Sequence, residues 1–193
     1  MKIVARLWLG LVALALSATL TLANAEGIKS RQVQVEQTDT NILVNASFQI
    51  DLPQELEDAV KKGVIFHFVT DLNITRGRWY WFDEKPVQAE KVIRLSYQPL
   101  TQQYKVSGGG LTLSAFTLKE ALIQVGSIGG WQVADFTQLD VGKQYQLEIR
   151  MRLDLAKLPK PFQINALNAR EWNLASDWQR FAFTPTQKAP SNK

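Results

Sequence analysis

The chain has 193 residues, a formal net charge of +4 and no cysteine, so it forms no disulfide and performs no thiol chemistry. Its 22 basic and 18 acidic residues are spread along the sequence without the dense basic stripe that a phosphate backbone requires, so no nucleic-acid partner is expected. Hydrophobic residues make up 46% of the chain, enough to bury a core without a metal or a cross-link.

The N-terminal segment predicts a bacterial export signal. Lys2 and Arg6 supply a charged start, residues 7–22 form an apolar stretch, and small residues precede a cleavage point after Ala25. We therefore expect cleavage there and a periplasmic protein. A retained membrane anchor is the alternative, but a spanning helix needs about 20 mainly apolar residues, and polar side chains interrupt the second half of this stretch.

The length that remains after cleavage fits one domain. We predict a signal peptide over residues 1–25, a single domain over residues 26–183 and a disordered tail over residues 184–193. The tail is rich in proline and polar residues, which do not bury enough apolar surface to pack. No membrane span is expected after cleavage.

Apolar and polar residues alternate from Gln32 onward, which is the pattern of a half-buried strand. Residues 42–50 continue the alternation after a turn at 39–41, and this predicts a hairpin with one exposed face. A short helix is expected next, with Pro53 in its first turn and Gly63 as its left-handed cap.

Residues 64–74 are almost all apolar or β-branched, which predicts a central strand covered on both faces. Thr117 and Glu120 have the spacing of a capping box and predict a second short helix over residues 118–125. Glycines 108–110 indicate a turn. Further strands are expected at residues 79–82, 92–97, 103–106, 111–113, 145–153, 172–174 and 178–183.

Many short strands separated by turns favour an all-β fold over a parallel sheet with crossover helices. Tyr145 opens a long strand directly after the loop 139–144, an arrangement that resembles the structural tyrosine corner of immunoglobulin-like domains. We therefore predict an antiparallel immunoglobulin-like β-sandwich with two short helices in its connections. Another β-sandwich or an open barrel is the alternative.

Reactive side chains are sparse in this sequence. His67 is the only histidine, and a zinc site needs three or four ligands, so we expect a neutral structural histidine, no metal and no cofactor. Two carboxylate pairs, Asp83 with Glu84 and Glu55 with Asp58, are compatible with a hydrolase, but spacing alone does not place them across a cleft. We predict a non-enzyme, with a carboxylate-based hydrolase as the minor alternative.

An aromatic segment carries the strongest candidate binding surface. Trp79 and Trp81 would share one face of a strand, where paired indoles bind sugar rings, proline-rich peptides or an apolar partner. Arg76 and Arg78 would stack on these rings or pair with Asp83. The alternative is that the rings pack into the core.

A second segment of note, residues 158–161, reads LPKP. Two prolines in four residues predict a rigid exposed connection, and a docking motif is the alternative.

Four segments together resemble a known family. They read RWYWFDEK at residues 78–85, RLSYQPLTQQY at 94–104, RMRLD at 150–154 continuing to LPKP at 158–161, and AREWNLASDW at 169–178. The chain is identified through them as a member of an uncharacterised family of exported proteobacterial proteins, catalogued as a domain of unknown function (family 4390). The resemblance covers nearly all of the mature chain. It implies export and a single domain, and no activity, ligand or catalytic residue.

Genes of the resembled family often lie beside a membrane sensor kinase of the nitrogen-regulation type, which hints at a partner. We therefore expect an exported, non-catalytic interaction module that binds an envelope protein or a sensor ectodomain. The alternative is carbohydrate or peptidoglycan binding through Trp79 and Trp81.

Overall fold

The computed structural model describes residues 27–76 and 84–186. The elements in chain order are β1 (Gly27–Gln37), β2 (Asn41–Asp51), α2 (Gln54–Lys61), β3 (Phe66–Arg76), β4 (Glu84–Gln98), β5 (Gln103–Gly108), β6 (Leu111–Ala115), α3 (Leu118–Gly126), β7 (Ser127–Asp135), the 3-10 turn η1 (Phe136–Gln138), β8 (Tyr145–Leu153), η2 (Leu155–Lys157), α4 (Lys160–Asn168), η3 (Arg170–Trp172) and β9 (Gln179–Phe183).

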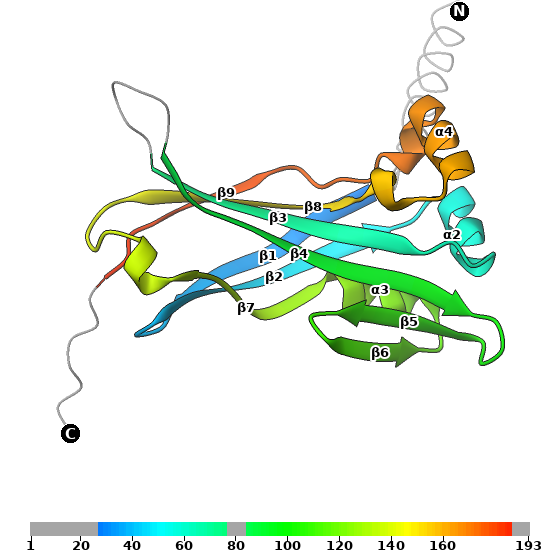
Figure 1. Cartoon of the computed structure of the whole chain (residues 1–193), viewed down its shortest axis with the longest axis horizontal. Helices are drawn as coiled ribbons and strands as arrows, with labels where there is room; N and C mark the ends of the chain where they lie inside the picture. The colour runs from blue at the N-terminus through cyan, green and yellow to red at the C-terminus, as the bar shows by residue number, and fades with distance from the viewer. Residues whose placement is uncertain (1–26, 77–83, 187–193) are drawn as a thin grey trace, which may run out of the picture.

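The strands form two antiparallel sheets around one hydrophobic core (Figure 1). The smaller sheet, sheet A, has the order β1-β2-β7, and the larger sheet, sheet B, has the order β6-β5-β4-β3-β8-β9. The antiparallel all-β prediction is thereby confirmed at the level of two packed sheets. Over the described part of the chain, no helix has the length and apolar character needed to cross a membrane.

The period-two sequence pattern builds the core directly. Every second residue of β2 and of β8 is buried, while the residues between them are mostly at least partly exposed. Because successive side chains of a strand point to opposite faces, each strand presents one apolar face to the other sheet. Burying one such Val, Leu, Ile or Phe side chain stabilises the fold by about 1.5–3 kcal/mol. The core-facing residues of the two strands are Ile42, Val44, Ala46, Phe48, Ile50, Tyr145, Leu147, Ile149, Met151 and Leu153.

The strand predicted to be central is β3, and it lies inside sheet B between β4 and β8. The prediction that both faces of this strand are covered is only partly met. Phe66, Leu72 and Ile74 are buried on the core side, whereas Asp71 and Asn73 on the outer side are only partly buried. The polar residues interspersed in this apolar run mark the outer face.

The described residues form three α-helices, where the sequence predicted two. α2 and α3 lie where they were expected, but α4 begins within the segment predicted to be an exposed connection. Pro159 directly precedes the helix and Pro161 lies in its first turn, where backbone N–H groups have no partner within the helix, so these prolines favour the helix start. The Pro159 carbonyl accepts hydrogen bonds from the N–H groups of Phe162 at 2.9 Å and Gln163 at 3.2 Å, and Leu158 is buried.

α2 and α4 lie together at one end of the sandwich (Figure 1). Trp172 joins them, because its ring packs 5.6 Å from Phe162 and its Nε1–H donates to Oε2 of Glu55 at 3.1 Å. Trp172 was expected in a strand, but it lies in η3, whereas the strand predicted at residues 178–183 is present as β9.

The ordered chain continues beyond the predicted start of the tail. Pro185 is buried, and its carbonyl accepts a hydrogen bond from Gly142 at 2.9 Å. The N–H of Thr186 donates to the Gln37 side chain at 3.0 Å. The polar composition of this segment predicted a loose tail, but the side chain of Gln37 and the backbone N–H of Gly142 supply residues 185 and 186 with hydrogen-bond partners.

Candidate functional site

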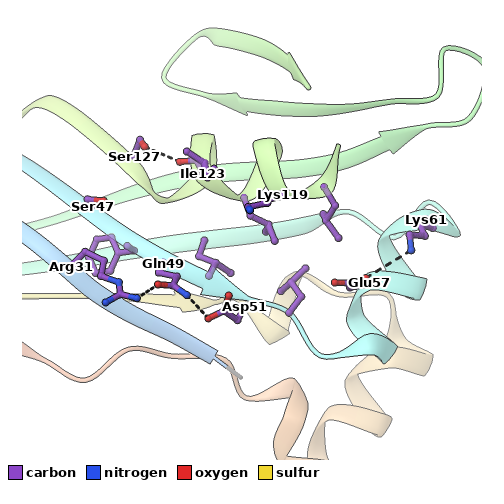
Figure 2. Close-up of a pocket in the computed structure, with 14 residues that line it drawn as sticks. Arg31, Ser47, Gln49, Asp51, Glu57, Lys61, Lys119, Ile123 and Ser127 are labelled. Carbon is purple, nitrogen blue, oxygen red and sulfur yellow. Dashed lines mark hydrogen bonds and ion pairs between the residues drawn. The ribbon is translucent and has the colours of Figure 1, made fainter. Parts of the chain in front are cut away.

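A groove of about 590 Å³ opens between β2, α2 and α3. Figure 2 shows α3 above the groove with Lys119 and Ile123, and α2 at one side with Glu57 and Lys61. β2 forms its floor. The sequence analysis did not identify this groove.

The groove exists because the pairing between β2 and β7 is short. The ladder ends at the pair Ser47–Ser127, and the chain before Ser127 is helix α3 rather than strand. From Phe48 to Asp51, the β2 edge therefore faces α3 and the groove, while its other edge stays paired with β1.

Gly126 sets how closely α3 approaches this edge. A Cβ atom on Gly126 would lie 2.1 Å from the carbonyl oxygen of Phe48, so only glycine lets the helix end rest on the β2 backbone. The same contact shows that the Phe48 carbonyl points away from β1. Since backbone groups alternate along a strand, those of Ile50 point to the same side, toward the groove.

α3 is held in place by its N-terminal cap. Thr117 Oγ1 accepts a hydrogen bond from the Glu120 N–H at 3.2 Å, and Glu120 Oε2 accepts from the Thr117 N–H at 3.4 Å, which is the predicted capping box. Ala121 and Val125 are buried against the sheets, whereas Ile123 is 59% exposed at the groove.

Charged and amide side chains form the rim. Gln49 donates to Oδ2 of Asp51 at 2.8 Å and accepts from Arg31, which a β-bulge between Ser30 and Gln32 places opposite β2. The charges of Glu57 and Lys61 lie 3.8 Å apart on α2.

Lys119 differs from the other charged residues of the rim. It forms neither an ion pair nor a side-chain hydrogen bond with a residue in the described part of the chain, whereas each of the other charged rim residues has at least one such partner. The groove therefore offers an unpaired strand edge, apolar side chains from α3 and a cation without a partner among the residues described.

Most residues of the predicted aromatic surface are not among those that the structure describes. Arg78, Trp79, Trp81 and Asp83 lie outside the described residues. Arg76 ends β3, and β3 starts beside α2 and runs across sheet B to the opposite end of the sandwich (Figure 1). Its residues span roughly 35 Å at about 3.3 Å each, so Arg76 is remote from the groove.

Arg76 meets the predicted tyrosine corner. Its Nη1 lies 2.5 Å from Oδ2 of Asp140, and its guanidinium lies 5.8 Å from the ring centre of Tyr145. The hydroxyl of the buried Tyr145 accepts a hydrogen bond from the Asp140 N–H at 2.9 Å. Sequence reasoning singled out Arg76 and placed Asp140 in the loop before Tyr145, but it did not foresee the ion pair of Arg76 with Asp140, since only the fold brings the three together.

His67 lies on the outer face of β3 between the buried Phe66 and Phe68. Burial, and next the positive charge of Arg94, lowers the pKa of His67 below its ordinary value of 6.5, so the imidazole is neutral near pH 7. Its Nδ1 is buried and has no hydrogen-bond partner among the described residues.

The carboxylates considered for hydrolysis have other partners where the structure describes them. Glu55 accepts from Trp172, and Asp58 accepts from Gln54 at 3.1 Å. Within residues 27–76 and 84–186, no three His, Asp or Glu side chains cluster in a way that could hold a metal ion.

The outer face of sheet B carries a charge network that sequence reasoning also missed. Asp71 Oδ2 accepts from the Nε–H of Arg150 at 2.9 Å and from that of Arg152 at 2.8 Å, and the Arg150 guanidinium lies 4.5 Å from the ring centre of Trp178. The hydrogen bond to Asp71 is the main cause that raises the pKa of Arg152. The pairing of Asp71 with Arg150 across β3 and β8 could not be read from either strand alone.

These features define a two-sheet β-domain with one helix-lined groove beside an open strand edge. The chain belongs to the family described as domain of unknown function DUF4390, whose model matches residues 25–182. The resemblance found in the sequence is therefore confirmed as family membership. No curated protein and no solved structure matches the chain.

Proposed function

We propose that the protein is a non-catalytic interaction module of the periplasm that binds an extended segment of an envelope protein or sensor ectodomain in the groove. The open β2 edge beyond the Gly126 contact at Phe48, from Gln49 to Asp51, carries this proposal. A strand edge with free backbone groups is a template for an added strand, and an extended peptide uses such edges in β-augmentation.

The size of the edge fits a short segment. Three residues at about 3.3 Å each span roughly 10 Å, so the edge takes about three residues of an extended chain. Ile50 supplies the N–H and C=O that pair with the bound backbone, since its groups point toward the groove.

The side chains of the groove specify the chemistry of the segment. Leu118, Leu122 and Ile123 of α3 offer an apolar wall for one hydrophobic side chain. Lys119 on the same helix offers a cation to a carboxylate. We therefore expect a segment that combines an apolar residue with a nearby Asp or Glu.

A displayed library of random peptides, panned on the purified protein, tests the proposal. We expect enriched peptides with an apolar residue beside an acidic one, and amide chemical-shift changes at Ile50, Lys119 and Ile123 when such a peptide is added. Lys119→Glu should weaken binding of the acidic peptides about tenfold or more, since both an attraction is lost and a repulsion gained.

Lys143→Glu is the matched control, because Lys143 is exposed and does not line the groove. It makes the same charge change and should leave binding unaltered. A library without enriched sequences, or shift changes that map to residues away from the groove, would contradict the proposal.

A further inference from the structure

β6 is the outermost strand of sheet B and is unusually unprotected. It reads Leu-Thr-Leu-Ser-Ala, without a charge or a proline, and it pairs with β5 without a register shift. Leu111 is 72% exposed, Leu113 is 51% exposed, and Phe116 directly after the strand is 76% exposed. Natural proteins usually guard such an edge with charges, prolines or bulges.

The other three edge strands of the described sheets carry these guards. β1 has a bulge between Ser30 and Gln32, β7 pairs with β2 through two register shifts, and β9 carries Arg180. β6 alone among the four has neither a charge nor a bulge. An edge left in this state indicates that another strand covers it.

The geometry of the β5–β6 hairpin shows which backbone groups of β6 do not pair with β5. Gly109 and Gly110 have φ angles of 58° and 82°, both positive, as a two-residue type I′ turn requires. The closing pair is therefore Gly108 with Leu111, and the backbone groups of Leu111, Leu113 and Ala115 face β5. Those of Thr112 and Ser114 point outward.

We propose that β6 pairs antiparallel with β6 of a second copy of this chain, about a two-fold axis at Leu113. In this register Leu113 lies opposite the partner's Leu113, and Thr112 lies opposite the partner's Ser114. The outward backbone groups of Thr112 and Ser114 then form the hydrogen-bonded pairs, and the leucines form the close, non-hydrogen-bonded pair. The two-fold axis therefore pairs the backbone groups of β6 that point outward, without a shift of register. The inference concerns self-association and goes beyond the proposed groove function.

The composition of β6 favours its own copy as the partner. Antiparallel pairing of identical strands brings identical or near-identical residues together, so any charge would meet its like. β6 has no charged residue. On its outer face the hydroxyl of Thr112 lies beside that of the partner's Ser114. On its inner face Leu111 lies opposite the partner's Ala115. Lys105 on β5 donates to Ser114 at 2.6 Å, and it would be about 16 Å from the partner's Lys105, because three strand spacings and a two-residue offset along the strand separate them. At physiological salt that repulsion is largely screened.

A cysteine placed on the axis tests this arrangement, because the natural chain has none. A non-hydrogen-bonded antiparallel pair has Cα atoms about 4.5 Å apart, within disulfide range. We expect Leu113→Cys to form a covalent dimer on mild oxidation. Ala182→Cys, at an exposed position of the opposite edge strand β9, is the matched control and should stay monomeric.

Sedimentation velocity on the unaltered protein completes the test. We expect a species with twice the mass of one chain, and Leu113→Lys should return it to a monomer with the same circular dichroism spectrum and a melting temperature that no longer depends on protein concentration. Leu113 is half exposed, so a lysine at this position does not prevent the single chain from folding. A monomer at all concentrations, which would leave the edge to a strand of a different protein, overturns the proposal, as does a dimer that Leu113→Lys leaves intact.

Discussion

At the scale of single residues, the contact between Gly126 and the Phe48 carbonyl decides whether the groove exists. The glycine ends α3 on the β2 backbone, and any side chain there would push the helix away from the strand. The sequence predicted a helix that ends at residue 125, directly before Gly126, but it gave no sign of the strand on which this glycine rests.

We predict that Gly126→Ala destabilises the protein. Alanine improves helix propensity by about 1 kcal/mol, but overpacking against a fixed backbone costs about 1–3 kcal/mol, and the 2.1 Å approach places this site at the upper end. Urea unfolding measures the difference. Gly129→Ala, where an added Cβ meets nothing within 4 Å, is the matched control. Equal stability of the two variants would show that α3 does not rest on β2.

A second prediction at this scale concerns the effect of His67 on the pH dependence of stability. Its pKa is lowered in the folded state, first by burial and then by Arg94, with Lys157 acting in the same direction and Asp154 against it. On acidification the unfolded chain therefore binds the proton first, and folding free energy is lost as the pH falls from about 6.5 toward the lowered pKa of His67 in the folded state.

The measurement is the urea midpoint at about pH 7.5 and about pH 5.5, a window that lies above most carboxylate titrations. We expect the unaltered protein to lose stability toward the lower pH, and His67→Gln to lose less. A variant with the same pH dependence would mean that the imidazole titrates alike in both states.

At the scale of elements, the helices at one end of the sandwich depend on each other. α2 supplies Glu55, the segment after α4 supplies Trp172, and the hydrogen bond between them closes the core at that end. α2 also forms one side of the groove, so this contact supports the candidate site from behind.

We predict that Trp172→Phe lowers the free energy of unfolding by about 1–3 kcal/mol, since the variant loses one hydrogen bond and part of a buried ring. Glu55→Gln keeps an oxygen acceptor and should lose less. Thermal or urea unfolding of both variants makes the comparison. A larger loss for Glu55→Gln would show that charge, not packing, holds the two helical segments together.

At the scale of the whole molecule, the end of the described chain ties three distant parts together. Pro185 accepts from Gly142 in the loop before β8, and Thr186 bonds the side chain of Gln37 at the end of β1. These contacts join the two sheets at the end opposite the helices (Figure 1).

We predict that a chain truncated after Phe183 unfolds more easily than one truncated after Thr186. The shorter chain lacks both contacts, and each hydrogen bond contributes about 0.5–1.5 kcal/mol, so the expected difference is about 1–3 kcal/mol. Calorimetric melting temperatures of the two proteins measure it. Identical values would place the end of the folded domain at Phe183, where the sequence had predicted it.

Sequence reasoning performed best where the signal is local. The alternation over residues 42–50 and 145–153 predicted β2 and β8, and Thr117 with Glu120 predicted the start of α3, because periodicity and capping act within one or two turns of chain. It failed at α4, where two prolines resemble a connection, and at β7, whose glycines obscure the strand pattern.

The amino-acid sequence by itself determined the class of fold, both early helices and the family, since these follow from patterns contained in continuous segments. Only the tertiary structure decided that β7 stops pairing at Ser47, that Gly126 rests on Phe48 and that β6 is an outer edge. The physical reason is that a groove and an edge depend on which strands become neighbours. That choice is made by contacts between residues far apart in the chain, and no local pattern encodes it.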